Sequence, residues 1–134
     1  MLAVNLKGTI AGSQAALRAM APHRRGHIVN VVSTAALRGI PTETVYSAAK
    51  WGVRGFTQGL REEAAPLNVR VTAVLPGGVD TAFWTAARPD RRMPVDRFLT
   101  PGQVAEAIVA LLDLDVAVVP QELVLRAMHD VDFA

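Results

Sequence analysis

Two residues four positions apart, Tyr46 and Lys50, carry side chains suited to proton transfer. Tyr46 is the only tyrosine in the 134-residue chain, and Lys50 is one of two lysines beside twelve arginines. Positions i and i+4 share one face of a helix, so a helix here would bring the hydroxyl and the ammonium together. A nearby cation favours the phenolate and is expected to lower the tyrosine pKa from its usual value of ~10. The pair is therefore a candidate general acid and base, although this spacing also fits a half-buried ring beside a solvated lysine.

The segments around this pair are predicted to form a strand followed by a helix. Apolar residues recur at helical spacing from Thr44 to Ala64, which predicts one amphipathic helix. The β-branched run from His27 to Val32 predicts a buried strand that ends in two hydroxyl side chains, Ser33 and Thr34. A serine at that position could donate a hydrogen bond to a substrate oxygen.

Four motifs in this chain resemble, in order and spacing, those of the classical short-chain dehydrogenases/reductases. They are Val4-Asn5-Leu6-Lys7-Gly8, Gly26 to Ser33, Tyr46-Ser47-Ala48-Ala49-Lys50, and Pro76 to Thr81. The resemblance covers residues 1 to about 128 and implies a catalytic set of Asn5, Ser33, Tyr46 and Lys50. It implies that an NAD or NADP cofactor contacts Tyr46, Lys50, Pro76, Gly77, Val79 and Thr81.

The resemblance also implies an activity and a role for each catalytic residue. The family transfers hydride between NAD(P)(H) and a secondary alcohol or ketone. By its pattern, Tyr46 protonates the carbonyl oxygen, and Lys50 lowers the tyrosine pKa and holds the ribose hydroxyls. Ser33 polarises the carbonyl, and Asn5 supports a proton relay by holding a water. The substrate is expected to be a small alcohol or carbonyl compound.

The family's glycine-rich phosphate-binding turn and its first strands have no counterpart in these residues. We therefore expect an incomplete Rossmann-like fold that lacks the N-terminal βαβ half, either as a fragment or as a truncated gene product. Two hypotheses stay open at this point. The chain is either an oxidoreductase of this family or a non-catalytic remnant that acts, if at all, as an oligomerisation module.

Alternating helices and strands predict an α/β fold with a doubly wound parallel sheet. A single domain over residues 1–134 is expected at this length. Further predicted elements are a helix from Leu2 to Met20, strands from Asn68 to Leu75 and within 120–128, and a helix opened by a capping box at Thr100 and Gln103. No period is visible from Ala82 to Leu99, which the resemblance implies is the segment that covers the substrate. Phe83 and Trp84 there either line a pocket or pack under a flap.

A stripe of small residues follows one side of the central predicted helix. Its members are Ala48, Gly52, Gly55 and Gly59. Each interior glycine destabilises a helix by about 1 kcal/mol relative to alanine. The stripe therefore indicates a helix surface where another segment packs closely. The resemblance implies a subunit interface and a homo-oligomer, and a tight contact within one chain is the alternative. The apolar edge of the first predicted strand would also favour association.

Composition excludes several other classes of function. The chain has no cysteine, which rules out disulfides and thiolate metal sites and fits a reducing compartment, so we expect no metal and a cytoplasmic location. The net charge of +2 is too small to indicate nucleic-acid binding, and the short basic clusters His23-Arg24-Arg25 and Arg88 to Arg92 are expected on solvated loops. No apolar run approaches the length of a membrane span, and no membrane partner is expected.

Overall fold

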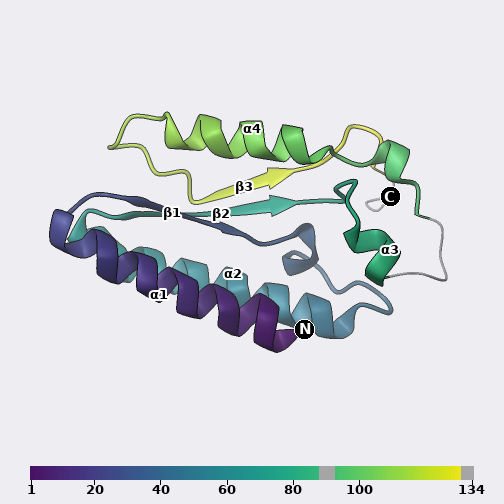
Figure 1. The fold of residues 1–134 in the computed structure, drawn as a ribbon, viewed down its shortest axis with the longest axis horizontal. Helices are drawn as coiled ribbons and strands as arrows, with labels where there is room; N and C mark the ends of the chain where they lie inside the picture. Colours follow the sequence, from purple (N-terminus) through teal and green to yellow (C-terminus); the bar gives the residue numbers. More distant parts are fainter. Residues whose placement is uncertain (88–92, 131–134) are drawn as a thin grey trace.

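Three parallel strands form the sheet that carries the rest of the molecule in the computed structural model, which describes residues 1–87 and 93–130 (Figure 1). The strands are β1 (His27–Val31), β2 (Arg70–Pro76) and β3 (Glu122–Leu125), in the order β1-β2-β3. Ile28 lies beside Val71 in the first pair of strands, and Val74 lies beside Leu123 in the second. The parallel sheet predicted from the sequence is confirmed. The cluster predicted at Arg88 to Arg92 lies outside the described residues.

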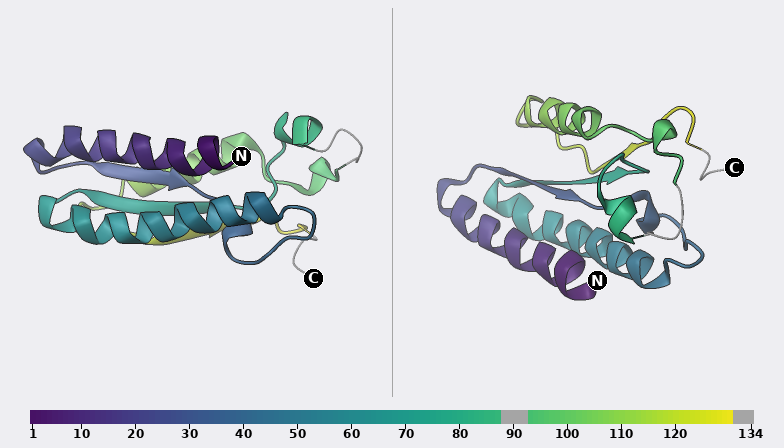
Figure 2. Two further views of the ribbon diagram at one scale, coloured as in Figure 1. Left: turned by 90° about the horizontal axis from the view of Figure 1, so that it is seen from below. Right: turned by 45° about the vertical axis from the view of Figure 1, so that its right-hand side comes forward.

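Helices lie on both faces of the sheet, as expected of a doubly wound fold (Figure 2). Helices α1 (Gly8–Met20) and α2 (Thr44–Ala64) run side by side on one face, and α4 (Pro101–Leu112) lies on the other. The α2 and α4 helices supply the crossover connections that parallel strands require. None of the helices in the described ranges is long and apolar enough to cross a membrane.

The hydrophobic core lies on the face covered by α1 and α2. Along β2, the side chains of Val71, Ala73 and Leu75 point to this face and are at most 1% exposed. Two buried clusters continue the core, one with Ile28, Leu60, Ala64 and Val69 and the other with Val32, Ala36 and Val53. Burial of these side chains holds α2 against the strands and so sets the position of every residue on that helix.

A buried line of hydrogen bonds joins the same three elements. Ser13 Oγ on α1 donates to Asn30 Oδ1 on β1 over 3.0 Å. Asn30 Nδ2 then donates to Thr57 Oγ1 on α2, also over 3.0 Å. The Thr57 hydroxyl in turn donates a hydrogen bond to the Val53 carbonyl over 2.7 Å. Each polar group buried here has a partner, so the layer is specified by polar as well as apolar contacts.

Helix bounds follow the local sequence signals closely. The α2 helix spans Thr44–Ala64 as predicted, and α4 begins after Thr100 with both bonds of the capping box present. The predicted helix from Leu2 to Met20 consists of a π-helical turn, Ala3–Lys7, followed by α1. The second strand starts two residues later than predicted because Asn68 adopts a left-handed conformation (φ 57°) and turns the chain into β2.

The segment without a visible period contains a short helix that the sequence did not indicate, α3 (Phe83–Ala87). Side chains hold its first turn in place. Trp84 Nε1 donates to the Val79 carbonyl over 2.8 Å, and the Phe83 amide donates to Thr81 Oγ1 over 3.3 Å. A helix of five residues is too short to show a period, so these contacts, and not an apolar stripe, determine it.

The glycines of the α2 stripe have different surroundings. A Cβ on Gly52 would lie 3.1 Å from the δ-carbons of Leu6, so glycine here permits close approach between α2 and the turn before α1. A Cβ on Gly55 or Gly59 would meet nothing within 4 Å. A tight contact within the chain therefore explains Gly52 and leaves the other two unexplained.

Candidate active site

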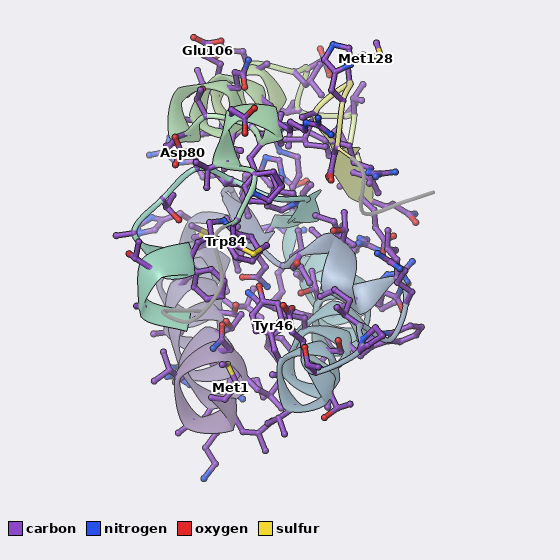
Figure 3. The ribbon with its side chains drawn as sticks, turned by 90° about the vertical axis from the view of Figure 1, so that its right-hand side faces the viewer. Met1, Tyr46, Asp80, Trp84, Glu106 and Met128 are labelled. Atoms are coloured by element: carbon purple, nitrogen blue, oxygen red, sulfur yellow. The ribbon has the colours of Figure 1, made fainter. Side chains whose placement is uncertain are left out.

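A cavity of about 350 Å³ opens at the carboxyl ends of β1 and β2. This is the end of a parallel sheet where α/β proteins bind their ligands. All eight residues predicted from the sequence line it: Asn5, Ser33, Tyr46, Lys50, Pro76, Gly77, Val79 and Thr81. Figure 3 looks onto this end of the molecule, with Tyr46 near the centre and Trp84 beside it. The structure therefore brings together residues from four separated parts of the chain.

Lys50 is buried, with 9% of its surface exposed. Its ammonium donates one long hydrogen bond, 3.4 Å, to the carbonyl of Val31 at the end of β1. Burial lowers the pKa of Lys50, because it removes water from the charged form. The alternative of a solvated lysine beside a half-buried ring is therefore wrong. A buried ammonium has three donors, and one long bond leaves it able to hold ligand oxygens.

Tyr46 differs from its sequence-based expectation in the direction of its pKa shift. Burial raises the pKa of Tyr46, a hydrogen bond with Ser33 lowers it, and the charge of Glu43 raises it again. The expected lowering by Lys50 is wrong for this structure. The ammonium lies over the ring, 5.6 Å from its centroid, and the loss of water around the hydroxyl outweighs any attraction to it. The neutral phenol is therefore the favoured form.

Ser33 is placed by the turn that follows β1. Its backbone is extended, and its Oγ accepts a hydrogen bond of 3.1 Å from the Ala35 amide. The same side chain hydrogen-bonds to Tyr46. One hydroxyl is thus held by the backbone on one side and joined to the phenol on the other, so the two can point at a common ligand oxygen.

Asn5 lies at the rim of the cavity, on the π-helical turn before α1. Its Nδ2 donates to the Met1 carbonyl at 3.3 Å, and Thr9 Oγ1 donates to the Asn5 carbonyl at 2.8 Å. Single π-helical turns occur frequently at functional sites. The asparagine shares the cavity with the tyrosine and lysine, but its amide contacts its own turn and not either of those side chains.

The Pro76-Gly77-Gly78 turn is held from behind by two distant segments. The Gly77 amide donates to the Leu125 carbonyl over 2.8 Å. A Cβ on Gly77 would lie 2.8 Å from a carboxylate oxygen of Asp130, and one on Gly78 would lie 2.6 Å from the Phe98 ring. Gly78 therefore requires glycine for space against the Phe98 ring, whereas a side chain at Gly77 would displace the Asp130 carboxylate. The turn presents Val79 and Thr81 to the cavity.

Several cavity residues were not predicted from the sequence. They are Val31, Val32, Thr34, Ile40, Pro41, Glu43, Gly78 and Met93. Glu43 stands three residues before Tyr46, directly ahead of α2, and this was the one available sign that it would face the tyrosine. A larger hollow of about 1070 Å³ lies between residues 96–103 and 126–130, and it contains none of the predicted residues.

Comparison with known proteins identifies the family of the chain. The family model for short chain dehydrogenases matches residues 1–92. An uncharacterized oxidoreductase of Staphylococcus aureus is 40% identical over 112 residues, covering 84% of this chain and 47% of the relative. A 2-(S)-hydroxypropyl-CoM dehydrogenase of Xanthobacter autotrophicus is 39% identical over 124 residues, covering 84% of this chain and 49% of the relative. The chain thus spans about half the length of the curated relatives it matches.

Solved structures give the same result. An alcohol dehydrogenase from the archaeon Thermococcus sibiricus, complexed with 5-hydroxy-NADP, superposes with a TM-score of 0.84 at 30% identity. The superposition covers 97% of this chain and 53% of that protein. Sequence, fold and cavity agree, and the chain belongs to the short-chain dehydrogenase family.

Proposed function

We propose that this chain provides the catalytic residues of an NAD(P)-dependent oxidoreductase that interconverts a secondary alcohol and a ketone. One observation carries the proposal. Asn5, Ser33, Tyr46 and Lys50, which are separated by up to 45 residues in sequence, line a single cavity with the Pro76–Thr81 turn. Family membership supports the reaction class.

The residues of the cavity fit a nicotinamide cofactor. The buried Lys50 ammonium has hydrogen-bond donors to spare for ribose hydroxyls, and Val79 and Thr81 would contact the carboxamide. The related Thermococcus sibiricus enzyme was solved with 5-hydroxy-NADP, which supports NAD or NADP here. When bound, such a cofactor gives hydride to a carbonyl carbon or takes it from an alcohol carbon.

Tyr46 transfers a proton to the substrate oxygen. Because its pKa is raised, the phenol is protonated at neutral pH and can act as a general acid toward a carbonyl oxygen. When a substrate is bound, the Ser33 hydroxyl, whose single proton otherwise points to Tyr46, would turn that proton to the substrate oxygen and polarise the carbonyl. Lys50 stabilises the phenolate left after transfer, and Asn5 positions a water for its reprotonation.

Replacing Tyr46 with Phe tests this assignment, because it removes the hydroxyl and keeps the ring. Loss of one general acid lowers turnover by about 10²- to 10⁴-fold. We expect that loss with an unchanged melting temperature and unchanged binding of NADH or NADPH, followed by fluorescence titration. Trp51→Phe, an exposed position on the same helix, is the matched control. Full activity in Tyr46→Phe, or no cofactor binding by the folded wild-type chain, would contradict the proposal.

We also propose that copies of the chain associate through α2 in the cytoplasm. Gly55 and Gly59 leave an open surface on this helix, and Trp51, one turn from Gly55, is 48% exposed. The absence of cysteine from the sequence agrees with a reducing compartment. Sedimentation velocity over a range of concentrations should show a reversible oligomer that Trp51→Glu shifts to monomer. A monomer at every concentration would contradict association.

A further inference from the structure

Four aromatic rings form a continuous row from the candidate acid to the far side of the cavity mouth. The centroids of Tyr46 and Phe83 are 5.9 Å apart, those of Phe83 and Trp84 5.2 Å, and those of Trp84 and Phe98 5.1 Å. These separations lie in the range of favourable ring contacts. The row joins α2, α3 and the segment before α4, and Tyr46, Phe83 and Trp84 line the cavity. Figure 3 labels Tyr46 and Trp84.

Beyond the Tyr46 hydroxyl, the row offers a ligand apolar ring surface and almost no hydrogen-bonding group. Trp84 has one donor, and that donor is already used at 2.8 Å by the Val79 carbonyl. Phe83 is 44% exposed although it is a large apolar side chain at the rim of a cavity. Ile40, Pro41 and Met93 add further apolar surface to the lining. A ligand with an apolar group would cover this surface and remove it from water.

Charge in the cavity is scarce and has a defined sign. In the part of the chain that the structure describes, the charged side chains lining it are Glu43 and Lys50. The proposed function assigns Lys50 to the cofactor, so among the described residues Glu43 is the charge left to face a substrate. Glu43 stands directly before α2 and lines the cavity with Tyr46, and its charge adds to the effect of burial in raising the pKa of that tyrosine. A negative group beside the reacting carbonyl would therefore meet repulsion.

A second cavity of about 220 Å³ lies beside the first. The two share Glu43, Tyr46 and Phe83 in their linings. Met1, Thr42, Thr44 and Val45 complete the lining of the second. A substituent on the carbonyl carbon can thus extend past the tyrosine and the Phe83 ring.

We infer that this site selects uncharged ketones and secondary alcohols with an apolar ring or alkyl group, and excludes those with a carboxylate next to the reacting carbon. Phe83 supplies the apolar contact, and Glu43 supplies the discrimination against anions. The inference rests on the proposed function, because it takes the Tyr46 hydroxyl as the point where the carbonyl oxygen binds.

The test uses Trp84 as its own reporter. In a Trp51→Phe background Trp84 is the one remaining tryptophan, so its fluorescence reports on the cavity. The probes are cyclohexyl methyl ketone and cyclohexylglyoxylate, in which a carboxylate replaces the methyl group. We expect saturable binding of the ketone. Binding of the keto acid should be about tenfold weaker, the effect of one like charge several ångströms away at the effective dielectric of a partly solvated site.

Substitutions at two positions separate the apolar contact of Phe83 from the charge of Glu43. Phe83→Ala should weaken ketone binding about tenfold, as loss of one aromatic contact predicts, while Phe83→Leu should retain most of it. Glu43→Gln should bring the two probes closer together in affinity by strengthening keto acid binding. Equal or tighter binding of the keto acid by the wild type, no saturable ketone response, or an unchanged affinity in Phe83→Ala would overturn the inference.

Failure of the substrate inference can be distinguished from failure of the proposed function. Tyr46→Phe keeps the ring that Phe83 contacts, so it should still bind the ketone while losing turnover. A wild-type chain that reduces the keto acid faster than the ketone would keep the oxidoreductase assignment and overturn the substrate class.

Discussion

On the face of the sheet covered by α1 and α2, the side chains of β1 and β2 are sealed from water, whereas on the face under α4 the side chains of β2 are buried and those of β1 are only partly covered. Val71 and Leu75 on the first face have no exposed surface. On the second side, α4 buries Leu111 to 6% but leaves Val109 and Leu112 55% and 45% exposed. The helix also lies over β3 and away from β1 (Figure 1), where Val31 is 49% exposed.

This difference divides the candidate site into two kinds of residue. Tyr46 and Lys50 belong to α2, and Ser33 lies in the turn directly after β1, and the sealed face holds these elements together. Phe83 and Trp84 belong to the long connection between β2 and α4, in which none of the side chains from residue 77 to residue 86 is buried. Proton transfer demands fixed geometry, and a rigid layer provides it. Substrate selection tolerates a segment that adapts.

The largest effect that separates the two faces is expected from truncating one leucine on each. Leu75→Ala removes a fully buried side chain from the sealed face and should lower the free energy of unfolding by about 2–5 kcal/mol. Leu112→Ala, on the partly covered side, should change it by less than about 0.5 kcal/mol. Urea unfolding followed by circular dichroism measures both.

Equal losses in these two variants would mean that the exposed side of α4 is covered in solution. That result would remove the contrast between the faces and place a partner on α4. As a control, the dependence of the free energy of unfolding on urea concentration should be the same in both variants as in the wild type. An unchanged dependence shows that each variant exposes the same amount of surface on unfolding.

Local signals in the sequence predicted most of the helices and strands. The bounds of α2 follow from an apolar period sustained over 21 residues, and the start of α4 follows from a Thr-Pro-Gly-Gln capping box. Both signals lie within a few residues of the feature that they predict. The parallel sheet follows from the alternation of elements, because two parallel neighbours need a crossover between them.

The site was predictable only as a set of residues, by resemblance, and not as an environment. Spacing on a helix placed Tyr46 beside Lys50, but the direction of the tyrosine pKa depends on how much water the fold removes and on Glu43. Neither quantity can be read from positions along one helix. The row from Phe83 to Phe98 was likewise invisible, because it forms across turns that place residues 46, 83, 84 and 98 together.

A smaller effect is expected from His27, at the start of β1 on the partly covered side. Its Nε2 lies 2.7 Å from Thr72 Oγ1, and the Thr72 hydroxyl donates a hydrogen bond of 2.6 Å to the Pro120 carbonyl. Nε2 must therefore carry the proton, which makes Nδ1 a bare acceptor. Nδ1 is buried and has no hydrogen-bond partner among residues 1–87 and 93–130. Protonating it would bury an unpaired N–H.

Stability should accordingly fall as the solution is acidified past the ordinary histidine range. Burial, and secondarily the charge of Arg70, lower the pKa of His27 from 6.5 in the folded chain. Below pH 6.5 the unfolded chain binds a proton at His27 that the folded chain does not bind. The free energy of unfolding therefore decreases with decreasing pH until the folded pKa is reached.

Replacing His27 with Gln tests this prediction, because Gln keeps a donor for Thr72 and does not titrate. Urea unfolding of wild type and His27→Gln between pH 7.5 and about pH 5.5, a range above the ordinary carboxylate pKa values, should show the decrease in the wild type alone. An equal decrease in both proteins would mean that a group other than His27 causes the loss of stability. The partly covered face would then contribute no acid sensitivity through His27.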